Sequence, residues 1–240
     1  QYQDWRVSHG FLDGDILVGL SPDQAPAQTY TTMDRETQKS LADAGDPGAM
    51  QAYAAGSLPD DPFAAIDYYR RASESGSAAA MARLAEVLAG VNAMSMANTR
   101  QDPHFAERLL ALRGGDPERD LRQDAVAWAL ASIRQYGPIL ATSTNLKLVE
   151  SLGNTPDKAM VAAVCGQSLA ILGALSAATS GKGTSALPPV FVTEQGLYDR
   201  LPCRDTPAPV TPPRALGACT ASPATGSNNR PIELWICPET

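Results

Sequence analysis

The chain has 240 residues, and its 19 Lys and Arg against 26 Asp and Glu give a formal net charge of −7. This length is enough for one large domain or two small ones with a self-sufficient hydrophobic core. Nucleic acids and anionic membranes bind basic surfaces, so the acidic balance excludes them as main partners. With 44% apolar and 19% charged residues, the composition is that of a folded protein.

The first residues show whether the chain carries a signal peptide. The chain begins at Gln1, and residues 2–6 are polar and lack the apolar core of a signal peptide. We therefore expect either a mature form from which a signal peptide has been removed or a trimmed chain.

Helix starts are marked by a capping residue followed by proline. Proline is tolerated at the first helical position, and it pushes the preceding residue into the extended conformation of an N-cap. Six such pairs predict a string of short helices. They are Ser21-Pro22, Asp46-Pro47, Asp61-Pro62, Asp102-Pro103, Asp116-Pro117 and Thr155-Pro156.

The segment from Pro62 to Leu88 predicts two helices joined by a turn at Gly76. Each helix has one apolar stripe at helical spacing, so the two are expected to pack as a helical hairpin. The stripes are Phe63, Ile66, Tyr69 and Ala72 in the first helix, and Ala80, Leu84, Val87 and Leu88 in the second.

The hairpin recurs along the chain. Aligning residues 41–50 with residues 72–81 places Gly45 on Gly76, an offset of 76 − 45 = 31. A third copy is indicated at residues 125–128, which align with residues 65–68. A helix–turn–helix unit that repeats every 20 to 50 residues is typical of an α-solenoid.

Residues 65–84 resemble a Sel1-like repeat, whose pattern runs Ala-x-x-aromatic-aromatic-x-x-Ala-Ala-x-x-Gly and continues with Ala and Leu at intervals of four. Ser73 and Ala85 depart from this pattern. The resemblance implies a mainly α fold, a short and degenerate α-solenoid of TPR-like hairpins over residues 1–185, that binds another protein. The matching residues are Ala65, Tyr68, Tyr69, Ala72, Gly76, Ala80 and Leu84.

Five polar or aromatic residues of the best repeat are expected to project away from its apolar stripe, and they are the candidate partner-binding residues. The plainer interpretation is a solvated face with intrahelical ion pairs, Asp67 with Arg71 and Arg70 with Glu74, each stabilising the helix by about 0.2–0.5 kcal/mol. The five candidates are Asp67, Tyr68, Arg70, Arg71 and Glu74.

Residues with catalytic chemistry are few. His9 and His104 form no HExxH motif and no metal set, and residues 181–185 (GKGTS) lack the first glycine and the Ser/Thr position of a phosphate-binding loop. Cys165 lies in an apolar helix, which raises a thiol pKa and opposes reactivity. We therefore expect no enzyme activity, no metal and no cofactor.

No charged residue lies between Lys158 and Lys182. A membrane-spanning helix needs about 20 strongly apolar residues, whereas this stretch is rich in Ala, Gly and Ser. The sequence favours a helix buried inside a bundle and no transmembrane segment.

Residues 186–240 differ from the rest of the chain, because residues 187–240 hold 10 of the 19 prolines. We expect this Pro-rich extension to pack on the helical part. Residues 190–192 and 232–236 look like strands, and two interpretations stay open: a small β-hairpin or an irregular tail.

The four cysteines are confined to the last third of the chain, and their spacing contains no CxxC pair for zinc or for a redox site. Four reduced thiols in a cytosolic protein are one interpretation. We favour two disulfides, in any of three pairings, in a protein of the bacterial periplasm or exterior. The cysteines are Cys165, Cys203, Cys219 and Cys237.

Three functions follow from these expectations. The first is a non-catalytic envelope adaptor or regulator that binds another protein through the Sel1-like array. The second is an immunity protein that neutralises a basic toxin, because an acidic surface speeds association with a basic partner. The third is a hydrolase or cell-wall enzyme in which carboxylates cluster or His9 and His104 converge.

Overall fold

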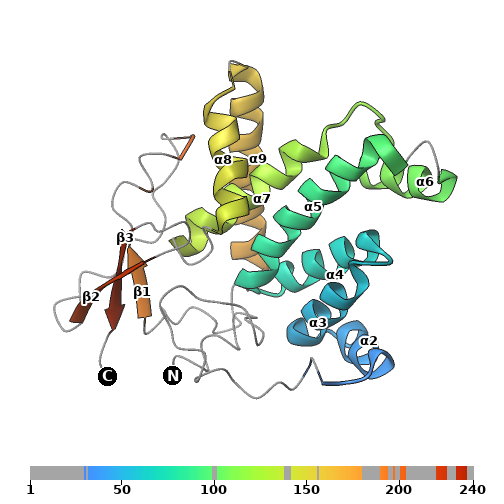
Figure 1. Ribbon diagram of the computed structural model, residues 1–240, viewed down its shortest axis with the longest axis horizontal. Coiled ribbons are helices and arrows are strands. Elements are labelled where there is room, and N and C mark those ends of the chain that lie inside the picture. Colours follow the sequence, from blue (N-terminus) through green and yellow to red (C-terminus); the bar gives the residue numbers. More distant parts are fainter. Residues whose placement is uncertain are drawn as a thin grey trace.

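The computed structural model describes residues 30, 32–98, 102–137, 142–155, 157–179, 190–193, 197, 201–203, 220–225 and 231–236. This part of the chain is mainly helical and ends in a small sheet (Figure 1). The helices are α2 (Arg35–Asp43), α3 (Pro47–Ser57), α4 (Pro62–Glu74), α5 (Ala78–Asn98), α6 (Pro103–Leu112), α7 (Leu121–Tyr136), α8 (Ser143–Gly153) and α9 (Lys158–Thr179).

From α2 to α5, helices that follow one another in sequence pack together. Helix α2 contacts α3, α3 contacts α4, and α4 contacts α5, which lies along α7; α8 and α9 both pack on α7. Figure 1 shows α6 at one end of this helical body and the sheet at the other. Helix α7 is the central element, because it joins the α2–α5 part to α8 and α9.

The two predicted apolar stripes form the core between α4 and α5. Ile66 and Tyr69 are only 1% and 3% exposed, and Leu84 on α5 is fully buried. The remaining stripe residues are buried as well, which confirms this part of the prediction. Alanines at the crossing, Ala65 and Ala80, have no exposed surface, because close approach of two helices requires small side chains there.

The turns at Gly45 and Gly76 have the same geometry. The glycines have φ of 101° and 100°, a left-handed conformation that disfavours residues with a Cβ. Gly45 N donates to Ala42 O and Asp46 N to Leu41 O; Gly76 and Ser77 repeat both hydrogen bonds 31 residues later. Each turn is a Schellman motif that closes one helix and starts the next.

Three of the predicted helix starts are confirmed. Asp46, Asp61 and Asp102 cap α3, α4 and α6 with a proline following. The pair Asp116-Pro117 does not start a helix: Asp116 accepts from Glu118 N in a turn, and α7 begins after Asp120.

The start of α9 also differs from the prediction at Thr155-Pro156. The Asp157 side chain accepts from the N–H groups of Ala159 and Met160, so it caps the helix. Carboxylates further along the chain supply the N-cap both here and at Asp120, because an Asp side chain satisfies a free helix N–H without a proline. Ser21-Pro22 lies outside the described residues.

The apolar stretch after Lys158 forms a helix, but the expectation that a bundle buries it is wrong. The buried residues of α9, namely Val164, Ser168 and Leu175, lie on one side of the helix, and α9 packs mainly on α7. The opposite side faces outward, because α9 lies at the edge of the helical body and no later helix covers it within the described chain (Figure 1).

The two segments that looked like strands do pair, so of the two open interpretations the structure has a small sheet, with three strands in place of a two-stranded hairpin. Strands β1 (Val190–Thr193) and β3 (Pro231–Ile236) are antiparallel, with Val190 opposite Ile236. A further strand, β2 (Thr220–Thr225), pairs with the other side of β3. It was not predicted, because its sequence TASPAT has low strand propensity; its proline is tolerated on an edge strand.

One of the predicted disulfides is present. It joins Cys165 on α9 to Cys203 in the Pro-rich region, with a Cα–Cα distance of 5.7 Å. It holds the segment at residues 201–203 against the helical part. Cys219 and Cys237 lie outside the described residues.

Candidate interaction surfaces

Within the described part of the chain, residues with catalytic potential are not brought together. The side chain of His104 is 78% exposed in the first turn of α6, and its Nδ1 lies 3.9 Å from Glu107 Oε2. Among the residues that the structure describes, no three His, Cys, Asp or Glu side chains are placed to hold a metal ion. His9 and the segment 181–185 lie outside them.

Three of the five candidate partner-binding residues on α4 lie toward solvent. The side chains of Asp67 and Arg70 are 76% and 40% exposed, and they form an ion pair at 3.7 Å. Glu74 is exposed in the last turn. Asp67 therefore pairs with Arg70 rather than with Arg71 as predicted, because Arg71 reaches a different helix.

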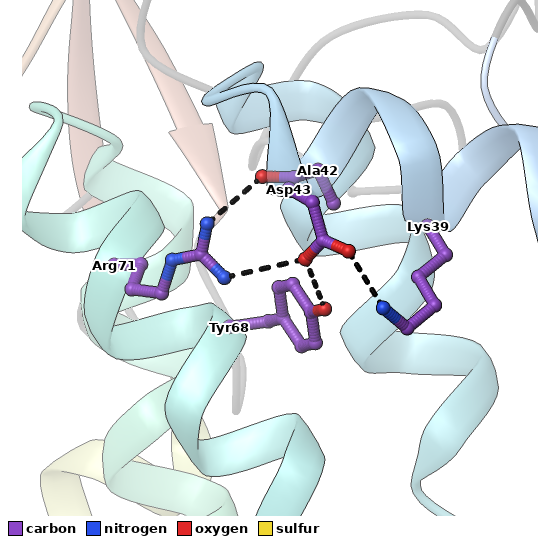
Figure 2. Close-up of polar contacts among 5 residues, drawn as sticks. All are labelled: Lys39, Ala42, Asp43, Tyr68 and Arg71. Carbon is purple, nitrogen blue, oxygen red and sulfur yellow. Dashed lines mark hydrogen bonds and ion pairs between the residues drawn. The ribbon is translucent and has the colours of Figure 1, made fainter.

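The other two candidates, Tyr68 and Arg71, contact α2, and 41% of the Arg71 side chain stays exposed (Figure 2). The Tyr68 hydroxyl donates to Asp43 Oδ1 at 2.6 Å, and the whole residue is only 9% exposed. Arg71 Nη2 donates to Ala42 O at 3.1 Å, and its Nη1 lies 3.7 Å from Asp43 Oδ1. Lys39 Nζ contacts Asp43 Oδ2 at 2.6 Å.

This α2–α4 clamp (Lys39, Ala42, Asp43, Tyr68 and Arg71) places positive charge at the C-terminal end of α2, where the helix dipole favours it. The hydrogen bonds from Lys39 and Tyr68 lower the pKa of the Asp43 carboxyl below its ordinary value. Partial burial, followed by the hydrogen bond to Asp43, raises the pKa of Tyr68. Asp43 is therefore ionised and Tyr68 neutral around pH 7.

Aromatic contacts extend the clamp to α3. The Tyr53 and Tyr68 rings meet edge to face, with centroids 4.8 Å apart. The Arg35 guanidinium lies 4.0 Å from the Tyr53 ring centroid and donates from Nη1 to Tyr53 O at 2.7 Å. Together these contacts fix the relative placement of α2, α3 and α4, so Tyr68 and Arg71 have a structural role.

The outward side of α9 is a second and larger candidate surface, and the sequence did not predict it as one. No charged residue follows Lys158 in this helix, and Leu169 is 39% exposed. We call this surface the α9 face. Its exposed residues include Ala162, Ala163, Gly166, Leu169, Ala170, Gly173, Ala174 and Ala177.

In the described part of the chain, Lys158–Ala178 is long and apolar enough to cross a membrane by length and composition. Polar and covalent contacts nevertheless tie α9 to the helical body. Gln167 Nε2 donates to Asp124 Oδ1 at 2.5 Å, and Arg119 Nη2 contacts the same oxygen at 2.9 Å. The Cys165–Cys203 disulfide adds a covalent link.

An open depression lies between the end of α5 and the loop before α7. Two arginines, Arg113 and Arg119, line it together with the carboxylates of Glu118 and Asp120. Opposite charges are therefore balanced within it. Arg119 is moreover paired with Asp124, so this depression offers neither a cation nor an anion site.

No family model, curated protein or solved structure matches this chain. The candidate surfaces therefore stand on the geometry of the described residues. One signal for the α9 face was present in the sequence, namely the absence of charge between Lys158 and Lys182. That absence fitted a buried helix equally well, because hydropathy does not say how many neighbours a helix has.

Proposed function

We propose that this protein is a non-catalytic binding protein of the bacterial envelope, an adaptor or regulator whose helical array docks another protein. The α9 face is the observation that carries the proposal. A helix at the surface normally has charged residues on its solvent side, and α9 has none beyond Lys158. Uncharged exposed patches of this kind mark contact surfaces.

The helix pairs α2–α3 and α4–α5 support the repeat architecture that this function needs. We assign them to two Sel1-like repeats, because their turns at Gly45 and Gly76 share the same hydrogen bonds and because Ala49 and Ala80, equivalent in the alignment, are both fully buried. Stacked hairpins present continuous surfaces to protein partners. On α4 the residues available for such contact are Asp67, Arg70 and Glu74.

A lipid bilayer is the competing occupant of the α9 face. Insertion of α9 into lipid would remove Gln167 from Asp124 and would draw Cys203, its covalent neighbour through Cys165, toward the hydrocarbon layer. Both changes are unfavourable, because an unsatisfied polar group in lipid costs several kcal/mol. These contacts favour a protein partner.

The compartment part of the proposal rests on the disulfide. Disulfides persist in oxidising compartments such as the bacterial periplasm and are reduced in the cytosol. The Cys165–Cys203 bond therefore supports a protein that works outside the cytoplasm.

A substitution on the α9 face tests the proposal. The partner is first identified by cross-linking the oxidised protein in envelope extract, and its affinity is then measured by titration calorimetry. Ala170→Lys introduces a charge at the centre of the α9 face and is expected to weaken binding on the order of 10-fold or more, because the charge must be desolvated. Arg70→Glu reverses a charge on the exposed side of α4, and weaker binding of this variant would show that this surface contacts the partner.

Ala55→Lys is the matched control, because Ala55 is exposed on α3. It makes the same chemical change as Ala170→Lys, so the two variants alter charge and helix propensity alike. Unchanged affinity for both Ala170→Lys and Arg70→Glu would overturn the proposal. So would flotation of the wild-type protein with phosphatidylcholine vesicles if Ala170→Lys abolished it, since the α9 face would then bind lipid.

The net charge of −7 favours a second candidate, an immunity protein whose partner is a basic toxin. Complementary charge accelerates the association of such pairs and makes the rate depend on salt. Co-expression with any toxin encoded beside its gene tests this candidate. Rescue of growth by this protein is expected, and persistent toxicity rules the candidate out.

A further inference from the structure

A segment from the C-terminal region of the same chain contributes two leucines to a buried apolar cluster of α5, α7 and α8. We call the helix side of this cluster the α5–α7–α8 groove. Leu197 and Leu201 of that segment are 0% and 5% exposed. They pack in one cluster with side chains of all three helices. The helix residues of this groove are Ala85, Ala129, Leu130, Ile133, Leu146 and Val149.

The segment is also held by its main chain. Arg134 on α7 donates from Nη2 to Pro202 O at 3.0 Å and to Cys203 O at 2.5 Å. Arg134 is only 7% exposed, so its guanidinium lies buried against the segment. Contacts to carbonyl oxygens do not depend on side-chain identity, so a segment of another sequence accepts the same hydrogen bonds from Arg134.

The Cys165–Cys203 disulfide links the end of the segment covalently to α9. Cys203 has φ of 69°, a left-handed conformation that disfavours a residue with a Cβ. The disulfide and the hydrogen bond from Arg134 hold Cys203 in that conformation. Both contacts end at the same residue, so cleavage of one bond weakens the anchoring of the whole segment.

We propose that the α5–α7–α8 groove is a peptide-docking site that the chain occupies with its own residues 197 and 201–203, and that the Cys165–Cys203 disulfide is the latch that keeps it closed. The groove fits a partner segment with two leucines four residues apart, followed by residues whose carbonyls meet Arg134. This site lies apart from the α9 face and does not depend on it.

The latch opens by thiol–disulfide exchange with a dithiol reductant. One thiolate of the reductant attacks a sulfur of the Cys165–Cys203 bond, and its second thiol resolves the mixed disulfide. The chain gains two electrons and two protons as two thiols, and the dithiol leaves as a disulfide. The unlatched segment then competes with a partner segment at an effective concentration of about millimolar.

The probe that tests the proposal is a fluorescent peptide of residues 195–206 with Cys203→Ser. Anisotropy is measured with three full-length proteins: oxidised wild type, the unlatched variant Cys165→Ser/Cys203→Ser, and the unlatched variant that also carries Leu197→Ala and Leu201→Ala. We expect no binding to the oxidised wild type, weak binding to the unlatched variant, and binding at least 10-fold tighter to the third protein, whose own segment competes poorly.

The control peptide carries Leu197→Ala and Leu201→Ala and is expected not to bind. The proposal is wrong if the third protein keeps its helical circular dichroism and does not bind the probe, or if oxidised wild type binds as tightly as the unlatched variant. Equal binding of both peptides would also overturn it.

Hydrogen exchange on the wild-type protein tests the latch if the third protein does not fold. Addition of a dithiol is expected to lower amide protection in α8 and in the second half of α7, which the segment covers, and to leave α2–α4 unchanged. Identical protection in α8 before and after reduction contradicts the proposal.

Discussion

Carboxylates at helix ends act on two elements at once. Asp61 Oδ1 accepts from Ala64 N as the N-cap of α4 and contacts Arg108 Nη2 of α6 at 2.8 Å. Partial burial raises the pKa of Asp61, but the hydrogen bonds from Arg108 and Ala64 outweigh it and leave the pKa below its ordinary value. One side chain therefore starts α4 and attaches α6 to it.

Two substitutions separate these roles. Asp61→Asn keeps a capping side chain and loses the ion pair, so it is expected to cost less than about 1 kcal/mol. Asp61→Ala loses both and is expected to cost about 1–2 kcal/mol. Urea denaturation at pH 7 measures both free energies of unfolding, and equal losses for the two variants would contradict the capping role.

The α2–α4 clamp predicts a pH dependence of stability. The pKa of Asp43 is lowered in the folded protein, so its ionised form stabilises the fold above the unfolded-state pKa of about 3.9. That contribution is lost as the pH falls through the folded-state value, which lies below about 3.9.

We therefore expect Asp43→Asn to lower the free energy of unfolding at pH 7. Between pH 5 and pH 2, the free energy of unfolding of the variant is expected to fall less than that of wild type. Urea titrations at several pH values check this, with Asp67→Asn, a largely exposed carboxylate, as the control. A steeper acid loss in Asp43→Asn than in wild type would contradict the expected sign.

At the scale of elements, the glycine turns decide where one helix ends and the next begins. Gly45 has φ of 101° and nothing within 4 Å of the position that a Cβ would take. Backbone conformation, and not lack of space, therefore disfavours residues with a Cβ there. Gly90, in the middle of α5, also has open space around it but has no left-handed φ.

The two glycines make a matched pair for Gly→Ala substitution. Gly45→Ala is expected to destabilise the fold by about 1 kcal/mol, because alanine is strained in a left-handed conformation. Gly90→Ala is expected to stabilise it by about 0.5–1 kcal/mol through helix propensity. Thermal melts of both variants check the opposite signs; a destabilised Gly90→Ala would contradict them.

The sequence predicted those elements whose determinants are local. The stripes of α4 and α5, the turn at Gly76 and the Asp-Pro helix starts follow from residues within a few positions of each other. The direction of Tyr68 and Arg71 was not predictable in this way, because their acceptor Asp43 lies 25 residues before Tyr68. Strand β2 was missed because pairing with β3, and not propensity, makes it a strand.

At the scale of the whole molecule, the disulfide joins the last helix to the Pro-rich region across a sequence separation of 38 residues. A bridge over a loop of this length stabilises a fold by about 3–4 kcal/mol, because it restricts the unfolded chain. The placement of α9 belongs to this scale as well. Its composition was compatible with a buried or an exposed position, and the number of helices packed around it decided between them.

We expect Cys165→Ser/Cys203→Ser to lower the free energy of unfolding by about 3–4 kcal/mol. The helical circular dichroism signal of the protein is expected to remain, because the disulfide does not contact α2–α5. Urea denaturation of the variant and of wild type with and without reductant measures the loss. Equal stability of oxidised and reduced wild type would contradict it.

The neighbour-to-neighbour packing of α2 to α5 also sets the order in which the chain folds. Contacts between residues close in sequence form quickly, since little loop entropy is lost in closing them. Residues of strand β1 pair with residues of β3 that lie 40 to 46 positions later, so we expect the sheet to form late. During synthesis we therefore expect the helical body to form first and strands β1, β2 and β3 to pair after it.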